Sequence, residues 1–244
     1  MTPLKTAVSV VIPMKNEALN VGPVVADIIS ACDGLTDFEV IVVDDGSTDG
    51  TGDLVLKMKD PRVRLVRHAK SGGQSAAVHS GVLAARGNII CTLDGDGQNP
   101  PMELPKLFLP LLAEGSEATG LVAGQRVARQ DTVSKLWASR IANALRAWIL
   151  KDGTRDTGCG LKGFRRDAFL RLPYFDHMHR YLPALFKRDG WKVMLVDVSH
   201  KERAAGTSNY TNLNRAIVGF SDLMGVAWLI RRRKKSHPEA PVDG

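Results

Sequence analysis

Cysteine is scarce in this chain of 244 residues, and the three cysteines, Cys32, Cys91 and Cys159, lie far apart in the sequence. None belongs to a C-x-x-C pair, so the sequence lacks the closely spaced pairs typical of zinc sites and of small disulfide-rich domains. We therefore expect reduced thiols in a cytosolic compartment.

Long hydrophobic runs are also missing. The longest weakly polar stretch, residues 216–230, contains Asp222 and is shorter than the roughly 20 apolar residues that a membrane-spanning helix needs. Residues 1–6 lead directly into a strand-like segment. The sequence therefore predicts neither a signal peptide nor a membrane span.

Aromatic residues are few, at 6% of the chain, although the net charge is +7. A basic chain favours anionic partners such as nucleic acid, anionic lipid head groups or phosphorylated substrates. Binding of single-stranded nucleic acid would use aromatic side chains among the basic ones as stacking platforms, and that pattern is absent. We predict no nucleic-acid partner, and a non-catalytic basic lipid- or nucleic-acid-binding protein is the alternative outside catalysis.

Short strand-like segments alternate with helix-length segments in the first half of the chain. The strand-like segments are rich in β-branched residues and are bounded by turn residues. They cover residues 7–13, 38–44, 62–67, 88–94 and 118–124, and the helix-length stretches cover 18–33, 49–59, 73–86 and 101–114. This alternation predicts an α/β fold with a mostly parallel sheet and helices on both of its faces.

The second half has a different pattern. Residues 133–151 predict an amphipathic helix with Trp137, Ile141, Leu145 and Trp148 on one stripe. The segments that follow are a glycine-rich loop (152–166), two helices (167–172 and 178–188), a strand (191–198), a basic loop (199–210) and a long helix running into residues 231–235. Because no linker separates two domains, we expect one domain over 1–235, with halves at about 7–126 and 127–235, and a disordered tail at 236–244.

Polar clusters follow three of the predicted strands. They are Lys15-Asn16-Glu17, Asp44-Asp45 and the segment from Asp94 to Gln98. Any one of them could be a turn or a helix cap. Ligands of parallel sheets bind at the carboxyl ends of the strands, so three clusters at one edge predict a binding site.

Asp94, Asp96 and Gln98 alternate with glycine after the fourth predicted strand. In an extended segment these side chains would lie on one face, and their oxygens suit Mg²⁺ or Mn²⁺. A solvated turn is the alternative interpretation. Haloacid-dehalogenase-type phosphatases also contain D-x-D, but there the motif usually opens the domain. A dinucleotide-binding domain is excluded because PMKNEALNVG, between the first strand and helix, lacks G-x-G-x-x-G.

The motifs in their order resemble a known family. VSVVIPMKNEALNV, VIVVDDGSTDGT, SGGQSAAVHSG, LDGDGQNPP and VAGQR are similar to successive motifs of family-two glycosyltransferases of the GT-A fold, which is Rossmann-like. RDTGCGLKGFRRD, HRYLPALFKRDGW and HKERAAGTSNY resemble the polyprenyl-phosphate glycosyltransferases, the dolichol-phosphate mannosyltransferase group. The resemblance covers about residues 7–230, and the Q-x-x-R-W motif of the processive polysaccharide synthases is absent.

Two features depart from that group. The segment usually written S-K-Y reads Ser208-Asn209-Tyr210, which removes a cation near the expected acceptor site. Many bacterial relatives also carry two C-terminal membrane helices, whereas this sequence offers one basic amphipathic helix.

The resemblance implies an inverting, metal-dependent transfer of a sugar from a nucleotide-sugar donor to a polyprenyl (dolichol- or undecaprenyl-type) phosphate at the cytoplasmic membrane face. Asp96 and Gln98 would ligate Mg²⁺ or Mn²⁺, and Asp94 would bind the metal or the donor ribose. Arg126 would reach the sugar or the diphosphate. The other residues implied in donor binding are Pro13, Lys15, Glu17, Val43, Asp45 and Gly95.

A phosphate acceptor explains why no general base is evident, because a phosphomonoester with a second pKa of about 6 is already ionised at neutral pH. Cations would guide it, and the candidates are Lys162, Arg165, Lys201 and Arg203, with Ser208 close by in the sequence. Arg203 is the first choice because a guanidinium binds phosphate bidentately. A solvated basic loop is the alternative, and Asp156 is expected to hold the loop.

Several identities stay open at this point. The alternative enzyme uses the same donor site with a saccharide or protein hydroxyl as acceptor. The nucleotide base is undetermined, and mannose, glucose or a uronic acid all fit as the sugar.

The last predicted helix offers a contact with the membrane surface. Its apolar residues recur at helical spacing, and they are Leu213, Ala216, Ile217, Phe220, Leu223, Met224, Ala227 and Trp228. Five cations follow, from Arg231 to Lys235. We expect peripheral binding to the anionic inner face of the cell membrane. Alternatively, the stripe packs on the sheet or forms an interface with a second copy or with a membrane protein.

Overall fold

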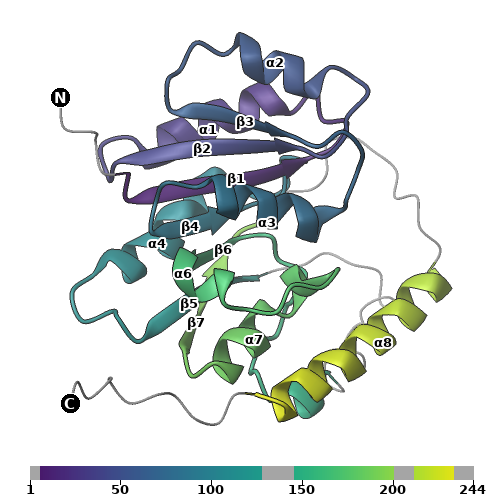
Figure 1. The fold of residues 1–244 in the computed structure, drawn as a ribbon. Coiled ribbons are helices and arrows are strands. Elements are labelled where there is room, and N and C mark those ends of the chain that lie inside the picture. The colour runs from purple at the N-terminus through teal and green to yellow at the C-terminus, as the bar shows by residue number, and fades with distance from the viewer. Residues whose placement is uncertain (1–5, 128–145, 201–211, 234–244) are drawn as a thin grey trace, which may run out of the picture.

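The computed structural model describes residues 6–127, 146–200 and 212–233 of the chain (Figure 1). Within them a seven-stranded sheet has the order β3-β2-β1-β4-β6-β5-β7. The strands are β1 (Val8–Met14), β2 (Phe38–Asp44), β3 (Val63–Arg67), β4 (Ile89–Thr92), β5 (Thr119–Arg126), β6 (Lys162–Arg165) and β7 (Lys192–Val198). β6 runs antiparallel to both of its neighbours, and the other pairs are parallel. The expected α/β class is confirmed.

Helices cover both faces of the sheet. They are α1 (Val21–Cys32), α2 (Thr51–Lys57), α3 (Gln74–Ala84), α4 (Leu104–Leu112), α6 (Arg166–Leu170), α7 (Leu182–Arg188) and α8 (Asn212–Arg231), with 3-10 turns η1 (Pro101–Glu103) and η2 (Met178–Arg180). Residues 146–150 are also helical.

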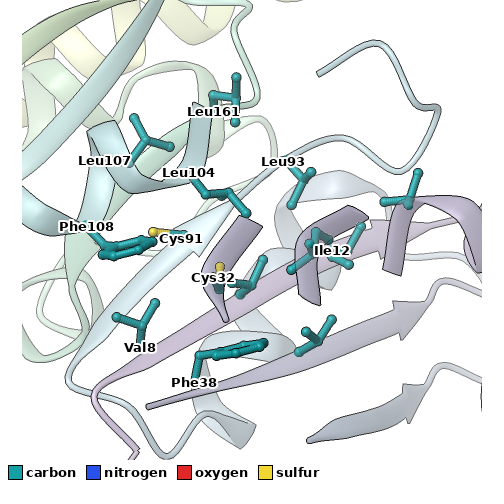
Figure 2. Packing of buried hydrophobic residues seen from close by; sticks show 14 of the residues in the cluster. Val8, Ile12, Cys32, Phe38, Cys91, Leu93, Leu104, Leu107, Phe108 and Leu161 are labelled. Atoms are coloured by element: carbon teal, nitrogen blue, oxygen red, sulfur yellow. The ribbon is translucent and has the colours of Figure 1, made fainter. Parts of the chain in front are cut away.

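The two faces of the sheet form two separate hydrophobic cores. Successive side chains of a strand point to opposite faces. In β1, Val8 and Ile12 therefore pack with α1 and α4, as Figure 2 shows, whereas Val11 packs with the helices of the other face, α3 and α7. Because both faces are buried, the central strands are continuously apolar, and this is why they were predictable from the sequence.

β6 is a correction to the sequence-based expectation of a loop over 152–166. Its four residues, KGFR, are bounded by charged side chains and give no hydrophobic pattern. The strand conformation comes from pairing, since β6 lies between β4 and β5 and is hydrogen-bonded to both. Sheet position, which is a tertiary property, therefore decides its conformation.

β4 ends two residues earlier than expected, at Thr92, and residues 95–97 form a turn. Gly97 adopts a φ of +75°, a backbone conformation that favours glycine. Asp94, Asp96 and Gln98 are therefore not presented by one face of a continuing strand. The turn at residues 95–97 determines where these three side chains lie.

The remaining expectations are only partly covered by the described residues. Of the helix expected at 133–151, residues 146–150 are described and helical, and 128–145 lie outside the described residues, as do 201–211 of the basic loop and 234–244. α8 ends at Arg231, where the basic run begins. Over the described part of the chain, no helix combines the length and apolar character needed to cross a bilayer.

The three cysteines are buried free thiols. Cys32 and Cys91 belong to the same core cluster, and burial raises the pKa of the Cys32 thiol to about 12. Protonated, buried thiols behave as small apolar core residues.

Candidate functional site

Two adjoining cavities lie at the carboxyl edge of the sheet, each of about 430 Å³. We call them the outer and the inner cavity. Both are lined by Pro13, Gln74 and Asp94, so they meet beside β1 and β4. The outer cavity is further lined by Met14, Lys15, Glu17, Asp45, Ser71, Gly73, Ala77, Gly95 and Asp96. The inner cavity adds Arg126, Asp156, Lys162, His179 and Arg180 among its polar residues.

Asp94 lies where the two cavities meet. Its Oδ1 accepts a hydrogen bond from Gln74 Nε2 at 2.7 Å, and its Oδ2 accepts one from Asn99 Nδ2 at 2.9 Å. Burial raises the pKa of Asp94, and the negative charge of Asp96 raises it further. Two carboxylates that repel each other at the mouth of a cavity favour a cation between them.

A divalent cation fits this pair by the chemistry of its donors. Mg²⁺ is commonly held by one or two carboxylates and completes its shell with waters and substrate phosphates. Asp94 and Asp96 match that pattern, and in the described residues no group of three or more His, Cys, Asp and Glu side chains gathers to form a larger shell. The main-chain N–H of Gln98 donates to Asp96 Oδ1 at 3.1 Å, although Gln98 itself lines neither cavity.

Asp45 anchors the turn beside the outer cavity. Its carboxylate accepts hydrogen bonds from Ser71 Oγ at 2.6 Å and from the main-chain N–H groups of Gly72 and Gly73 at 2.8 and 2.9 Å. Burial alone would raise the pKa of Asp45, but these bonds and that of His68 lower it. Asp45 is therefore an ionised wall of the outer cavity and fixes residues 71–73 to the end of β2.

The other residues expected at the nucleotide divide into two groups. Pro13, Lys15, Glu17 and Gly95 line the outer cavity. Val43 does not, because it is fully buried among the apolar residues between the sheet and α3. Its side chain belongs to the core and lines neither cavity.

Arg126 and Asp156 form the wall of the inner cavity. Arg126 donates through Nε to Asp156 Oδ2 at 2.5 Å and through a terminal nitrogen to Oδ1 at 2.9 Å. Asp156 thus holds Arg126 in a bidentate pair. The expectation that Asp156 holds the loop is met in part, because it also binds the N–H of Gly158 within that loop.

Lys162 is buried at the base of the inner cavity. Its ammonium donates to the carbonyl of Cys159, and burial lowers the pKa of Lys162. The carbonyl of Gly160 accepts from Thr92 Oγ1 at 2.8 Å, which holds the 156–160 loop against the end of β4. A Cβ atom at Gly160 would overlap with the Asp94 carboxylate, so only glycine permits this approach.

Arg165 lies away from the site, contrary to expectation. In β6, Lys162 pairs with Thr92 and Arg165 with Ile89, so the two cations stand at opposite ends of the strand. A strand rises about 3.3 Å per residue, which separates their Cα atoms by about 10 Å. The Arg165 guanidinium donates to the carbonyls of Thr119 and Ser116 and has a structural role.

Several expected site residues lie outside the described part of the chain, namely Lys201, Arg203 and Ser208. Conversely, sequence reasoning assigned no role to His179 and Arg180, which line the inner cavity. They come from the short turn η2, just over a hundred residues after Gln74. The quoted motif HRYLPALF contains them but gives no reason to place them beside Asp94.

Comparison with known proteins adds three observations. Residues 9–172 match the family described as Glycosyl transferase family 2. The chain is 32% identical over 210 residues to an undecaprenyl-phosphate 4-deoxy-4-formamido-L-arabinose transferase of Pectobacterium carotovorum, covering 84% of this chain and 63% of that protein. The protein with the same description in Photorhabdus laumondii is 31% identical over 208 residues, with 84% and 63% coverage. The chain thus spans somewhat less than two thirds of these relatives.

Solved structures share the fold. Glucosyl-3-phosphoglycerate synthase from Mycobacterium tuberculosis, in complex with Mn²⁺, UDP and glucosyl-3-phosphoglycerate, superposes with a TM-score of 0.68 at 20% identity, covering 92% of this chain and 80% of that one. The same synthase in complex with Mg²⁺ and UDP gives a TM-score of 0.67 at 22% identity, covering 92% and 79%. These neighbours agree with the expected GT-A fold.

Proposed function

The chain belongs to glycosyl transferase family 2, and from this premise we propose that it transfers a sugar from a nucleotide-sugar donor to a polyprenyl phosphate, with inversion and with Mg²⁺ or Mn²⁺. The observation that carries the proposal is the pair of cavities that meet at Asp94. The outer cavity receives the nucleotide, and the inner cavity receives the sugar and the acceptor phosphate. We also propose that residues 1–235 form a single domain.

The boundary between the cavities is where the leaving group would lie. Asp94 and Asp96 would hold the divalent cation, with Gln98 next to them in the chain. When bound, that cation would supply positive charge to the departing diphosphate. The solved structures that share the fold contain Mn²⁺ or Mg²⁺ together with UDP, which supports this use of the two carboxylates.

The inner cavity offers cations to a phosphate acceptor. Arg126, Lys162 and Arg180 line it, and a phosphate oxygen that is already ionised needs no general base to attack. The bond between this oxygen and the anomeric carbon forms while the bond from that carbon to the diphosphate breaks. Attack from the side opposite the leaving group inverts the anomeric carbon.

The choice of a lipid phosphate rests on the relatives and on α8. The relatives are described as undecaprenyl-phosphate transferases. On α8, Phe220, Met224 and Trp228 are 58%, 51% and 59% exposed at a spacing of four residues, and exposed cations Arg231 to Arg233 follow. An apolar face followed by cations suits an anionic bilayer surface, where a polyprenyl phosphate has its head group. We therefore propose peripheral association with the inner face of the membrane. Lys201, Arg203 and Ser208 belong to this proposal as acceptor-binding residues.

A product assay tests the proposal. The protein is incubated with Mg²⁺, undecaprenyl phosphate and a panel of UDP-, GDP- and dTDP-linked sugars, and lipid-linked products are identified by mass spectrometry. A sugar-phosphate-polyprenol formed with release of the nucleoside diphosphate is the expected result. Transfer to saccharide or protein hydroxyl acceptors in place of the lipid would establish the alternative enzyme. No transfer from any donor to any of these acceptors would overturn the proposal.

A further inference from the structure

His179 lines the inner cavity, although neither the metal site nor the phosphate site uses it. It lies in η2, directly before α7, and its ring is tied to the opposite side of the site. Nδ1 lies 2.7 Å from Ser75 Oγ, and the His179 main-chain N–H donates to the same oxygen at 3.4 Å. Ser75 is buried in the first turn of α3. The imidazole is therefore held in one orientation.

The ring is uncharged at neutral pH. Burial lowers the pKa of His179 well below its usual range, and the neighbouring charges of Lys162 and Arg180 lower it further. A neutral imidazole has one donor and one acceptor nitrogen. Nδ1 is engaged with Ser75, and within the described chain no hydrogen bond engages Nε2. Nε2 is thus the nitrogen that a ligand in the inner cavity would meet.

We propose that His179 Nε2 forms a hydrogen bond with a hydroxyl group of the transferred sugar and thereby helps to select that sugar. This inference rests on the proposed function. A hydroxyl both donates and accepts, so it matches Nε2 in either tautomer of the ring. Two of the charged groups that line the cavity already have partners, Arg126 with Asp156 and Lys162 with a carbonyl, and Arg180 is a cation suited to the phosphate. The neutral ring is the group suited to an uncharged hydroxyl.

Of the parts of the two substrates, the sugar is the one that the position of His179 suits. His179 lines the inner cavity and not the outer one, so the nucleotide lies beyond it. The acceptor phosphate carries negative charge and is better matched by Arg126 and Lys162 than by a neutral ring. A hydrogen bond from a rigid, buried partner distinguishes epimers, because a hydroxyl on the wrong side leaves Nε2 unpaired.

Binding experiments with and without the sugar test this inference. The panel member that the wild-type enzyme transfers fastest and the matching nucleoside diphosphate are each titrated with Mg²⁺ by calorimetry. His179→Ala is expected to weaken binding of the nucleotide sugar about three- to tenfold and to leave the nucleoside diphosphate unchanged. His179→Gln, which keeps a hydrogen-bonding group, should restore part of the loss. Discrimination between donors that carry epimeric sugars on the same nucleotide should fall in His179→Ala.

His79→Ala is the matched control. His79 is a half-buried histidine of α3 that packs against Tyr174 with ring centroids 5.0 Å apart and lines neither cavity. It should bind both ligands as the wild type does. Equal weakening of both ligands in His179→Ala, or unchanged affinity and selectivity for the sugar, would overturn the inference while the proposed function stands. Absence of transfer by the wild type would remove both.

Discussion

Asp94 and Asp96 stand one residue apart and have different surroundings. Asp94 is enclosed, with Gln74 and Asn99 donating to its two oxygens. Asp96 belongs to the turn and lines only the outer cavity. Asp94 is therefore held from two sides at the junction of the cavities, whereas Asp96 lines the outer cavity alone. Their different surroundings suit Asp94 to orienting a bound cation and Asp96 to direct ligation.

The first prediction is that Asp96→Ala lowers turnover at least about 100-fold, because a cation bound by one carboxylate fewer neutralises the leaving diphosphate poorly. The measurement is the rate of lipid-linked product formation at saturating Mg²⁺. EDTA should abolish the wild-type rate, and Mn²⁺ or Mg²⁺ should restore it.

Asp27→Ala, which removes an exposed carboxylate from α1, serves as the control and should keep the wild-type rate. The melting temperature of Asp96→Ala should stay close to that of the wild type, since a turn carboxylate at a cavity supports no core. Full activity of Asp96→Ala, or of the wild type in EDTA, would refute the assignment of the metal.

Residue types at the site were predictable where the chain places them directly after a strand. Lys15, Glu17 and Asp45 follow β1 and β2, and the parallel arrangement brings them to one edge. Arg165 and Val43 line neither cavity, because their neighbours in space decide where their side chains lie. Val43 is covered by α3, and Arg165 is carried to the opposite edge by the direction of β6.

At the scale of elements, the loop from Asp156 to Gly160 belongs to the second half of the chain and contacts two strands of the first half. It is held to β5 by Gln125, whose side-chain oxygen accepts from the N–H groups of Arg155 and Asp156, and to β4 by Thr92. A glycine-rich loop was predictable from the composition of residues 152–166, but its position against β4 and β5 was not. Gly160 matters because the loop comes closest to the Asp94 carboxylate there.

A second prediction follows for Gly160→Ala. The added methyl group would overlap with the Asp94 carboxylate, so Asp94 or the loop must shift. We expect destabilisation by about 1–3 kcal/mol, as for overpacking, and a loss of activity larger than the stability change explains. Urea unfolding and the product assay, run at a temperature where the variant is folded, measure the two effects.

Gly22→Ala in α1 is the control, because a methyl group there meets no atom within 4 Å. In a helix this replacement is neutral or stabilising by up to about 1 kcal/mol. If Gly160→Ala behaves like Gly22→Ala in both measurements, the loop does not position Asp94.

Glu39 links three strands at the opposite edge of the sheet. It is buried in β2 and accepts from Ser9 Oγ at 2.7 Å, from the main-chain N–H of Arg86 at 2.6 Å and from Arg64 at 2.7 Å. Burial alone would raise the pKa of Glu39, but these donors together lower it below 4.5. Its stabilising effect is therefore present above about pH 4.5 and is lost as the pH falls through the lowered pKa.

The third prediction uses this linkage. Glu39→Gln should cost about 2 kcal/mol of unfolding free energy at pH 7, and the difference from the wild type should shrink as the pH is lowered from 4.5 towards 2.5. Urea unfolding at several pH values measures it. Glu117→Gln, at an exposed position, should follow the wild type at every pH. A difference that is constant with pH would show that the charge of Glu39 contributes nothing.

Over the whole molecule, α8 connects the exposed apolar face to the inner cavity. α8 lies on the lower right in Figure 1. On the side of α8 that faces the protein, Leu223 and Val226 pack in the same core cluster as residues of α7. Asp222 accepts from His177 at 2.9 Å, two residues before His179, and Arg188 donates to the carbonyl of Leu229. The contact between α8 and His177 therefore lies two residues along the chain from His179, which lines the inner cavity.

The outward face of α8 was foreseen only in part. Helical spacing predicted one apolar stripe, but the structure divides it between two directions. Leu223 and Ala227 point into the core, whereas Phe220, Met224 and Trp228 are exposed. The helical spacing of apolar residues predicts that a helix is amphipathic, but packing against α7 decides which of these residues are covered. The exposed three are the ones left for a partner surface.

The last prediction concerns that surface. With vesicles containing anionic lipid at low salt, the protein should float, because each cation of the run from Arg231 to Lys235 adds about 1 kcal/mol at an anionic surface. Replacing these five cations by glutamine should release it. Replacing Phe220, Met224 and Trp228 together by serine should weaken binding even at low salt, since the apolar face supplies the part of the affinity that salt does not screen.

A charge-matched control separates a local contact from the overall positive charge. It replaces five exposed cations outside the run and outside α8 by glutamine: Lys57, Lys59, Lys106, Arg171 and Lys192. This variant loses the same charge and should still float if α8 is the contact. Equal loss in both five-fold variants would mean that net charge alone attracts the chain to the bilayer. Absence of flotation in the wild type, together with a concentration-dependent dimer that Trp228→Ser disrupts, would assign the exposed face to a second copy instead.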